Sequence, residues 1–272
     1  MPELPEVETA RAGLQAHVLG HRVERVRLHR ADLRFPIAAE ISSLLPGQRI
    51  HAVRRRAKYL LLDTSVGSLL LHLGMSGSLR VVEPTLALKK HDHIEIDLSS
   101  GLSLRFHDPR RFGACLWQAF DTEHALLTAL GPEPLNNDFD GGYLYARSRG
   151  RQVAVKNFLM DQRVVVGVGN IYAAEALFAA GIDPRRAAGE VSKTRYASLA
   201  SAVKAILRHA IARGGTTLRD FLDPTGNPGY FALELSVYGR TGQPCVKSGC
   251  TGLVQKVTLG QRSSFFCGVC QR

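Results

Sequence analysis

Residues 1–8, Met1-Pro2-Glu3-Leu4-Pro5-Glu6-Val7-Glu8, organise the chain. Pro5 stands where a first helical turn favours proline, and the acidic residues after it stabilise the positive end of a helix. Apolar residues then recur at helical spacing, at Val7, Ala10, Leu14 and Val18. Gly20 can end such a helix. The stretch therefore predicts an amphipathic helix from Pro5 to Gly20 that anchors the N-terminus.

Pro2 is a candidate nucleophile. Met1 precedes a small residue, so removal of the initiator methionine would leave Pro2 with a free secondary amine. An α-amino group titrates near ~7.7–8.0, so a useful fraction is unprotonated at neutral pH. Attack on an aldehyde carbon gives a cationic iminium, and Glu3 lies close enough to move protons. The alternative is an ordinary frayed terminus in front of a helix.

Composition and charge limit the class of protein. The 272 residues carry 35 Lys and Arg against 24 Asp and Glu, a net charge of +11. This excess indicates a polyanionic partner, with nucleic acid ahead of an anionic membrane surface; a merely basic protein is the alternative. No apolar run reaches membrane-spanning length, and the N-terminal acids are unlike a signal peptide. We expect a soluble, intracellular protein whose five cysteines favour metal binding or free thiols over disulfides.

The remaining pattern predicts a β-rich half followed by a helical half. Segments rich in Val, Ile, Leu and aromatic residues recur at 23–28, 50–62, 68–73, 78–82, 93–98, 102–106 and 112–120. Their regular spacing predicts a β-sandwich. Beyond a Gly- and Pro-containing boundary at 131–138, helical periods occupy 152–162, 171–180 and a long helix between Ser192 and Gly214-Gly215. A loop at 223–229 and a cysteine-bearing tail complete an α+β chain.

The tail has the layout of a structural zinc site. Four residues separate Cys245 from Cys250, sixteen separate the two pairs, and two separate Cys267 from Cys270. This pattern predicts one tetrahedral Zn²⁺ held by four thiolates on a β-hairpin, with disulfides or unconnected thiols as the alternative. The remaining cysteine, Cys115, is expected in the core. Arg262 would stand near the hairpin tip, where it is either a DNA contact or a solvated charge.

A glycine-rich turn, residues 163–170, links two predicted helices. Backbone N–H groups at the start of the second helix form an anion site suited to a DNA phosphate, and Asn170 could add a side-chain donor. A dinucleotide-binding turn is the competing interpretation. It lacks the third glycine, since that position is Tyr172, and no alternation of strands and helices surrounds it.

Basic and turn-forming clusters on the predicted sandwich occur at 54–58, 71–77, 89–93 and 107–113. They would line one DNA-binding face, or each would be a solvated charge run. His91, Asp92 and His93 also invite a metal-site interpretation, but a third partner at a recognised spacing is missing. Met75 and Phe112 are apolar residues on predicted turns, where they either complete the core or wedge into a base stack.

Taken together, the N-terminal stretch 1–8, the turn 167–170 and the cysteine tail make the chain resemble the bacterial formamidopyrimidine-DNA glycosylases along its whole length. The resemblance implies a β-sandwich domain preceded by a helix, a helix-two-turn-helix domain and a zinc-finger β-hairpin, flanking a DNA cleft. We expect the domains at residues 1–134, 135–234 and 235–272. The implied activity is removal of oxidised purines such as 8-oxoguanine, followed by strand cleavage through a Schiff base and β,δ-elimination.

The resemblance also assigns roles to residues. It makes Pro2 the nucleophile, Glu3 the acid and base, Glu6 a supporting carboxylate and Lys58 a phosphate-binding catalytic lysine. The implied DNA contacts are His72, Met75, His93, Arg110, Arg111, Phe112, Asn170 and Arg262. Among these, Met75, Arg110 and Phe112 would fill the void left by the flipped base, with Arg110 facing the orphaned cytosine. A loop at 223–231 would cover the extruded base.

Several expectations complete the prediction. The expected partner is double-stranded DNA with an oxidised purine, preferably opposite cytosine. We expect a monomer in the cytoplasm, associated with the nucleoid through DNA and with no membrane. The first cysteine pair departs from the usual two-residue spacing of the family, so its knuckle must be remodelled. Two alternatives stay open: an endonuclease VIII-like glycosylase for oxidised pyrimidines, and a non-enzymatic zinc-containing DNA-binding protein.

Overall fold

The structure is a computed structural model that describes residues 2–215 and 235–272. These residues form two compact units. The described part of the first unit is 2–128 with 213–215, and that of the second is 129–212 with 235–272. The three domain ranges expected from the sequence stay a prediction. The expected loops at 223–229 and 223–231 both lie outside the described residues.

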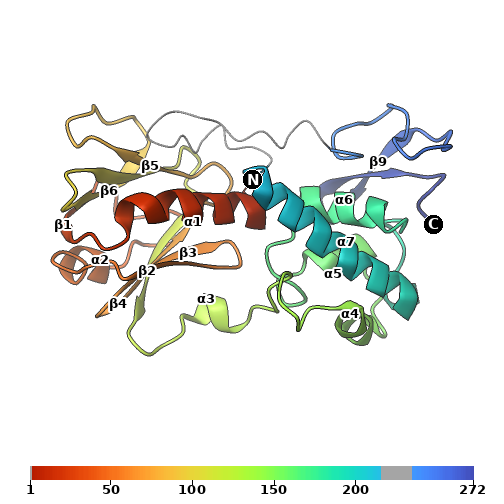
Figure 1. Cartoon of the computed structure of the whole chain (residues 1–272), viewed down its shortest axis with the longest axis horizontal. Helices are drawn as coiled ribbons and strands as arrows, with labels where there is room; N and C mark the ends of the chain where they lie inside the picture. The colour runs from red at the N-terminus through yellow and green to blue at the C-terminus, as the bar shows by residue number, and fades with distance from the viewer. Residues whose placement is uncertain (1, 216–234) are drawn as a thin grey trace. The chain divides into compact units, whose positions relative to one another are not determined.

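Helix α1 spans Leu4–Val18 and opens the first unit (Figure 1). Glu3 is its N-cap, and Glu3 with Glu6 forms a capping box around the first turn. The predicted apolar stripe is confirmed, since its four members are fully buried: Val7, Ala10, Leu14 and Val18. Gly20 follows the helix with φ +79°, a conformation that glycine adopts without strain.

Two four-stranded antiparallel sheets form most of the rest of the first unit, which confirms the β-sandwich. One sheet has the order β1 (Val23–Leu28), β6 (Asp92–Leu98), β7 (Ser103–His107), β5 (Ser78–Val82). The other has the order β2 (Ala52–Arg56), β3 (Tyr59–Thr64), β4 (Gly67–His72), β8 (Ala114–Ala119). A single core joins Leu14 of α1 to side chains of both sheets, such as Leu62 and Ile96.

One strand prediction was wrong. The apolar run 50–62 forms two paired strands, β2 and β3, and not one. The chain reverses at Ala57, whose φ is +54°, with Lys58 next to it. The sequence carries no Gly, Pro or Asn at this reversal, so the usual turn signal is missing. Lys58 consequently lies on a turn and not on a strand. Two short helices, α2 (Glu40–Ser43) and α3 (Ala125–Thr128), were also not predicted.

The second unit is mostly helical, as expected. Its elements are α4 (Gly141–Ser148), α5 (Val155–Met160), α6 (Asn170–Ala179), the 3₁₀ turn η1 (Ala188–Glu190), α7 (Lys193–Ala212), β9 (Val254–Leu259) and β10 (Arg262–Cys267). The predicted helix 152–162 is shorter in the structure. Residues 152–154 lie outside the helix: Ala154 forms an isolated antiparallel bridge with Ala187, and the Val153 carbonyl accepts the N–H of Ala188 at 2.9 Å. Helix α4, capped by Asp140, was not predicted.

Two apolar clusters hold the second unit together. The larger joins α4 to α7 and includes Phe158, Leu177 and Tyr196. The smaller packs α6 against the β9–β10 hairpin through Phe178, Val254 and other residues. The hairpin is therefore attached to the helix that begins at Asn170. In neither described segment of the chain does any helix have the length and apolar character needed to cross a membrane.

Candidate functional site

Pro2 directly precedes α1 and is partly exposed, whereas the side chains of Glu3 and Glu6 are 1% exposed. Oε2 of Glu6 accepts the backbone N–H of Glu3 at 2.8 Å. Because this bond belongs to the capping box, the backbone next to Pro2 is fixed by the start of the helix. After removal of Met1, two buried carboxylates would lie beside a secondary amine, which is the arrangement that proton transfer to an amine nucleophile needs.

Lys58 lies on the turn between β2 and β3 and is 6% exposed. Contacts of Arg55 tie this turn to α1. Its Nε donates to Oε2 of Glu8 at 2.9 Å, and its Nη1 donates to the carbonyl of Ala57 at 3.0 Å. The turn that carries Lys58 is thereby anchored to the helix that begins next to Pro2.

His72, the last residue of β4, is a neutral donor. Its Nδ1 accepts the N–H of Gly74 at 3.0 Å, which leaves the proton on Nε2. Burial, with the nearby charges of Lys58 and Arg34, lowers the pKa of His72 from 6.5 to about 4. Its ring packs on Tyr59 at 4.8 Å between centroids. His72 can therefore offer a hydrogen bond near pH 7, but no positive charge.

Two loops cross between the sheets at one end of the sandwich. Residues 73–77 join β4 to β5, and residues 108–113 join β7 to β8. The residues at both ends of the two loops are paired across the sheets: His72 with Ala114 and Ser78 with His107. The loops consequently run side by side. A Cβ atom on Gly74 would lie 2.4 Å from the Phe112 carbonyl carbon, so only glycine permits this approach.

These loops present the three predicted void-filling residues. Met75 is 42% exposed and Phe112 is 45% exposed, both unusual for large apolar side chains. The Arg110 guanidinium lies 4.9 Å from the centroid of the Phe112 ring, which orients both side chains together. Arg111 is exposed and holds φ at +56°. Exposed apolar groups beside a cation are suited to insertion into a base stack.

His93, predicted as a DNA contact, is 5% exposed. Its Nε2 donates to the carbonyl oxygen of Asp108 at 2.9 Å, and burial lowers its pKa. The His93 ring therefore holds the first residue of the loop 108–113 against strand β6. A direct contact between His93 and DNA stays a prediction.

In the second unit, Asn170 is the first residue of α6, and its side chain is engaged by protein groups. Its Oδ1 accepts Nζ of Lys156 at 2.6 Å, and its Nδ2 donates to the carbonyl of Ser263 at 3.0 Å. Lys156 is 1% exposed and also donates to Oγ of Ser264 at 2.7 Å. A buried ammonium group thus joins α5, α6 and β10. Sequence analysis missed Lys156 because a lysine inside an apolar helix gives no motif.

Arg262 is the first residue of β10 and is exposed, directly after the hairpin turn at Gly260 and Gln261. The predicted position of Arg262 at the tip is therefore confirmed. A Cβ on Gly260 would lie 2.6 Å from Nδ2 of Asn157, which shows how closely the tip packs on α5. The hairpin presents Arg262 on a fixed support.

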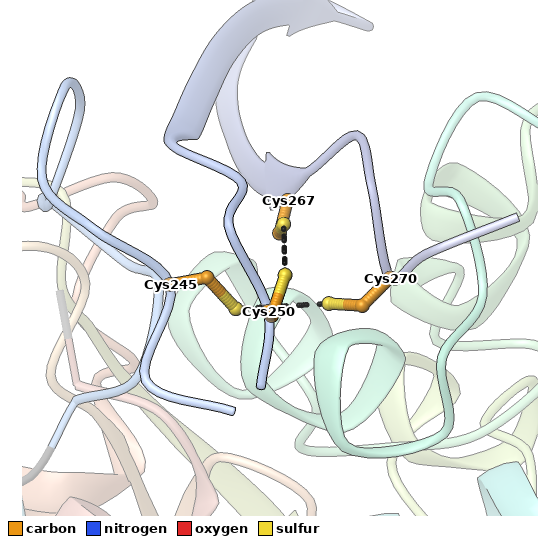
Figure 2. Close-up of side chains that lie close together, drawn as sticks. All are labelled: Cys245, Cys250, Cys267 and Cys270. Atoms are coloured by element: carbon orange, nitrogen blue, oxygen red, sulfur yellow. Dashed lines mark hydrogen bonds between the residues drawn. The ribbon is translucent and has the colours of Figure 1, made fainter. Parts of the chain in front are cut away.

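The four tail cysteines meet in space (Figure 2). All four sulfur atoms lie within 4.8 Å of one another, with Cys245 and Cys270 at 3.7 Å and Cys250 and Cys267 at 3.6 Å. Two sulfurs bound at ~2.3 Å to a tetrahedral zinc would lie ~3.8 Å apart. The donor set and its spacing therefore fit a zinc ion. Burial raises the pKa of Cys267, but hydrogen bonds from the N–H groups of Cys270 and Val269 and from the thiols of Cys270 and Cys250 together bring that pKa down to about 7.

The unusual first knuckle is closed by a local turn. Cys250 N–H donates to the Lys247 carbonyl at 3.1 Å, and Gly249 between them holds φ at +74°. Nζ of Lys247 lies 5.0 Å from the ring centroid of Phe178 on α6. The longer spacing is thus accommodated by a turn that also contacts the helix, and the four thiols still converge.

Within the first unit, the structure places Pro2, Glu3 and Glu6 in one cluster, Lys58 beside His72, and the three void-filling residues on the paired loops. Within the second, it joins Asn170 to the hairpin that carries Arg262. Sequence analysis also missed Asp108, a buried residue between the two loops. Its position in the charged stretch 107–113 was the available signal.

Family models match most of the chain. Residues 1–115 match the formamidopyrimidine-DNA glycosylase N-terminal domain, and residues 130–222 match the formamidopyrimidine-DNA glycosylase H2TH domain. Formamidopyrimidine-DNA glycosylases of Stenotrophomonas maltophilia and Pseudomonas savastanoi pv. phaseolicola are 62% and 59% identical to it, each over 100% of both chains.

Solved structures agree. A Lactococcus lactis Fpg complex with abasic-site DNA is 31% identical with a TM-score of 0.90, over 99% of both chains. A MutM complex with carbocyclic 8-oxo-G DNA is 32% identical with a TM-score of 0.90, over 100% of both chains. With this similarity along the whole length, added to the sandwich, the helical unit and the four-cysteine hairpin, the chain belongs to the formamidopyrimidine-DNA glycosylase family of DNA-repair enzymes.

Proposed function

We propose that this protein excises oxidised purines, including 8-oxoguanine and formamidopyrimidines, from duplex DNA and then cleaves the strand by β,δ-elimination. Membership in the family makes it a DNA glycosylase with lyase activity at abasic sites, acting in base excision repair. Relatives of similar fold were solved with DNA containing an abasic site, a carbocyclic 8-oxo-G or an N7-benzyl-Fapy-dG. These complexes of relatives support the proposed substrate class.

The observation that carries the proposal is the cluster of Pro2, Glu3 and Glu6. The lone pair of a free Pro2 amine attacks C1′ of the lesion nucleotide, and the damaged base leaves with the electron pair of the glycosidic bond. Glu3 moves protons to and from the sugar oxygen as the ring opens. The resulting iminium accepts the electrons released when C2′ loses a proton, so the 3′ phosphate departs and then the 5′ phosphate.

The DNA contacts follow from charge and exposure. We assign Lys58 and Arg262 to phosphates as cations, and Asn170 and His72 to phosphates as neutral donors. Met75, Arg110 and Phe112 occupy the void left by the extruded base, with Arg110 facing the orphaned cytosine. We also assign Arg111 and His93 to contacts with DNA. The protein acts as a monomer on chromosomal DNA in the cytoplasm.

We further propose that the four cysteines hold one Zn²⁺. Four thiolate ligands leave no open coordination position, so the ion would stabilise the hairpin and take no part in bond cleavage. Cys245, Cys250, Cys267 and Cys270 would each supply one sulfur atom. The role of this site is to hold Arg262 in place.

Borohydride trapping on a duplex containing 8-oxoguanine tests the proposal. The iminium between Pro2 and the opened sugar should be reduced to a stable amine, giving a covalent protein–DNA complex. A matched protein whose N-terminus carries an extra, uncleavable residue has an amide at Pro2 and should form none. Undiminished trapping by the blocked protein would move the nucleophile to a lysine. Preference for an oxidised pyrimidine in the same assay would favour the endonuclease VIII-like alternative.

A further inference from the structure

We propose that Asp108 is a positioning residue that clamps the loops 73–77 and 108–113 together, so that Met75 and Phe112 enter the DNA as one unit. We call these two segments the wedge loops. The inference rests on the proposed function, because it assumes that the two apolar side chains fill the void in the base stack. It adds a residue that holds them but does not itself contact the lesion.

The Asp108 carboxylate lies between the wedge loops. It is fully buried, and its two oxygens bind one group on each side. Oδ1 accepts the hydroxyl of Ser76 at 2.9 Å, and Oδ2 accepts the backbone N–H of Gly113 at 2.7 Å. Ser76 follows Met75 directly, and Gly113 follows Phe112 directly. One carboxylate therefore bonds to the neighbour of each wedge side chain.

The backbone of Asp108 is held from the opposite side. Its N–H donates to the carbonyl of His91 at 3.0 Å, and its carbonyl accepts Nε2 of His93 at 2.9 Å. His93 lies in β6 of the first sheet, and His91 directly precedes that strand. The clamp is thus fixed to the sandwich, and the wedge loops are held to the clamp.

Packing leaves the wedge loops little room to slide past each other. A Cβ on Gly113 would lie 2.6 Å from the Phe106 ring and 2.8 Å from the His72 carbonyl oxygen. A Cβ on Gly77 would lie 2.9 Å from the same ring. Both loops therefore rest on Phe106, and their relative position is decided by this contact and by Asp108.

A rigid pair has a functional advantage over two independent side chains. Filling the void must offset the free-energy cost of unstacking and unpairing a base. If Met75 and Phe112 moved separately, each would lose conformational freedom when it entered the stack. Clamped loops have already lost that freedom on folding, so more of the contact energy is available to hold the base out.

The experiment compares single-turnover rates on two substrates, a duplex with 8-oxoguanine and the same duplex with an abasic site. Ser76→Ala removes one arm of the clamp and should slow the 8-oxoguanine reaction about tenfold while changing the abasic reaction less than about twofold. Asp108→Ala should slow the first reaction more. Asp108→Asn can still accept from Gly113 and donate to Ser76, so it should restore most of the rate.

Ser103→Ala is the matched control. Ser103 is a serine of the same sandwich that is more buried than the partly exposed Ser76, and its Oγ has no hydrogen-bond partner among the described residues. Its replacement should leave both rates unchanged. If Asp108→Asn were as slow as Asp108→Ala, the carboxylate charge and not the bonded geometry would carry the effect, and the proposal would be wrong.

A double-mutant cycle measures the clamp directly. With Ser76 present, Met75→Ala and Phe112→Ala should be strongly non-multiplicative on the 8-oxoguanine duplex, because losing either disables the pair. In the Ser76→Ala background their effects should multiply. Coupling that survives in that background would overturn the clamp alone. Equal losses of Met75→Ala and Phe112→Ala on both substrates would instead overturn the wedge assignment in the proposed function, and the clamp with it.

Discussion

The backbone N–H of Glu3 donates to Oε2 of Glu6 across 2.8 Å, and both side chains are 1% exposed. A helix cap and a candidate catalytic cluster therefore share the same atoms. In an isolated helix the bond would only satisfy an orphan donor of the first turn. Here it also determines where the residue after Pro2 sits.

Glu6→Ala should slow base removal and abasic-site cleavage alike, by about ten- to a hundredfold, because Pro2 and Glu3 lose their support in both steps. It should also lower the free energy of unfolding by about 1 kcal/mol through the lost cap. Glu6→Gln keeps an oxygen acceptor for the Glu3 N–H and should retain the stability. Kinetics on both substrates and urea unfolding measure these effects. Loss of activity on the 8-oxoguanine duplex alone would contradict a role of Glu6 in both base removal and abasic-site cleavage.

Gly215 packs on Glu6 and should be sensitive for that reason. A Cβ there would lie 3.1 Å from Oε1 of Glu6, and φ is +82°. Gly215→Ala should displace the carboxylate and lower activity about tenfold. Gly20→Ala is the matched control, since Gly20 has φ +79° with nothing within 4 Å of its Cβ position. It should cost about 1 kcal/mol of stability without loss of activity. Equal activity of the two variants would exclude crowding at Glu6.

Lys156→Met should weaken binding of undamaged duplex DNA and destabilise the second unit by about 1–3 kcal/mol, because Asn170 and Ser264 lose a charged hydrogen-bond donor. Lys204→Met changes the same residue type on α7, where Nζ donates to the Asn136 carbonyl at 2.8 Å, and serves as control. Fluorescence anisotropy with labelled duplex and thermal unfolding give the two readouts. Unchanged DNA affinity in Lys156→Met would show that Asn170 keeps its position without the lysine.

His72 should make the protein more sensitive to acid. Its pKa is about 4 in the folded protein and 6.5 as its ordinary value, mainly because of burial. Between these pH values the unfolded chain binds more protons, so the stabilisation is present above pH 6.5 and declines as pH falls toward 4. His72→Asn keeps an acceptor for the Gly74 N–H but does not titrate. Between pH 6.5 and pH 4 the free energy of unfolding of His72→Asn should fall less than that of the unmodified protein. The difference should reach up to about 3 kcal/mol, and denaturant titrations at several pH values measure it. Parallel curves for both proteins would rule this out.

Removal of zinc, or Cys267→Ser, should cost DNA affinity more than overall folding, since thiolates at a closed site stabilise the local hairpin that carries Arg262. The measurements are zinc content, duplex affinity and far-UV circular dichroism before and after chelation. Cys115→Ser is the control, because that thiol is buried in the sandwich. Unfolding of the whole chain on chelation would contradict a local role, as would full affinity of a zinc-free sample.

The sequence by itself determined the features that depend on spacing. Apolar residues at helical spacing predicted α1, and regularly spaced strand-like segments predicted the sandwich. Four cysteines at metal-ligand spacing predicted the cluster that the structure shows. These features are local in the chain, and their resemblance to a family added the roles of individual residues. Turns without a Gly or Pro signal, such as the one at Ala57, escaped this reasoning because their conformation depends on the strands around them.

Only the tertiary structure decided how distant side chains combine. Asp108 contacts Ser76 because the β4–β5 and β7–β8 loops both cross from one sheet to the other. The residues that flank the two loops are paired in the sheets, so the loops lie side by side. Lys156 meets Ser264, 108 positions later, because the hairpin packs on α6. A buried charge needs hydrogen-bond partners, and these can be far away in the sequence. No periodic pattern in the sequence therefore indicates which residues they are. The strand and helix pattern thus follows from local physics, while the support of the candidate site follows from packing.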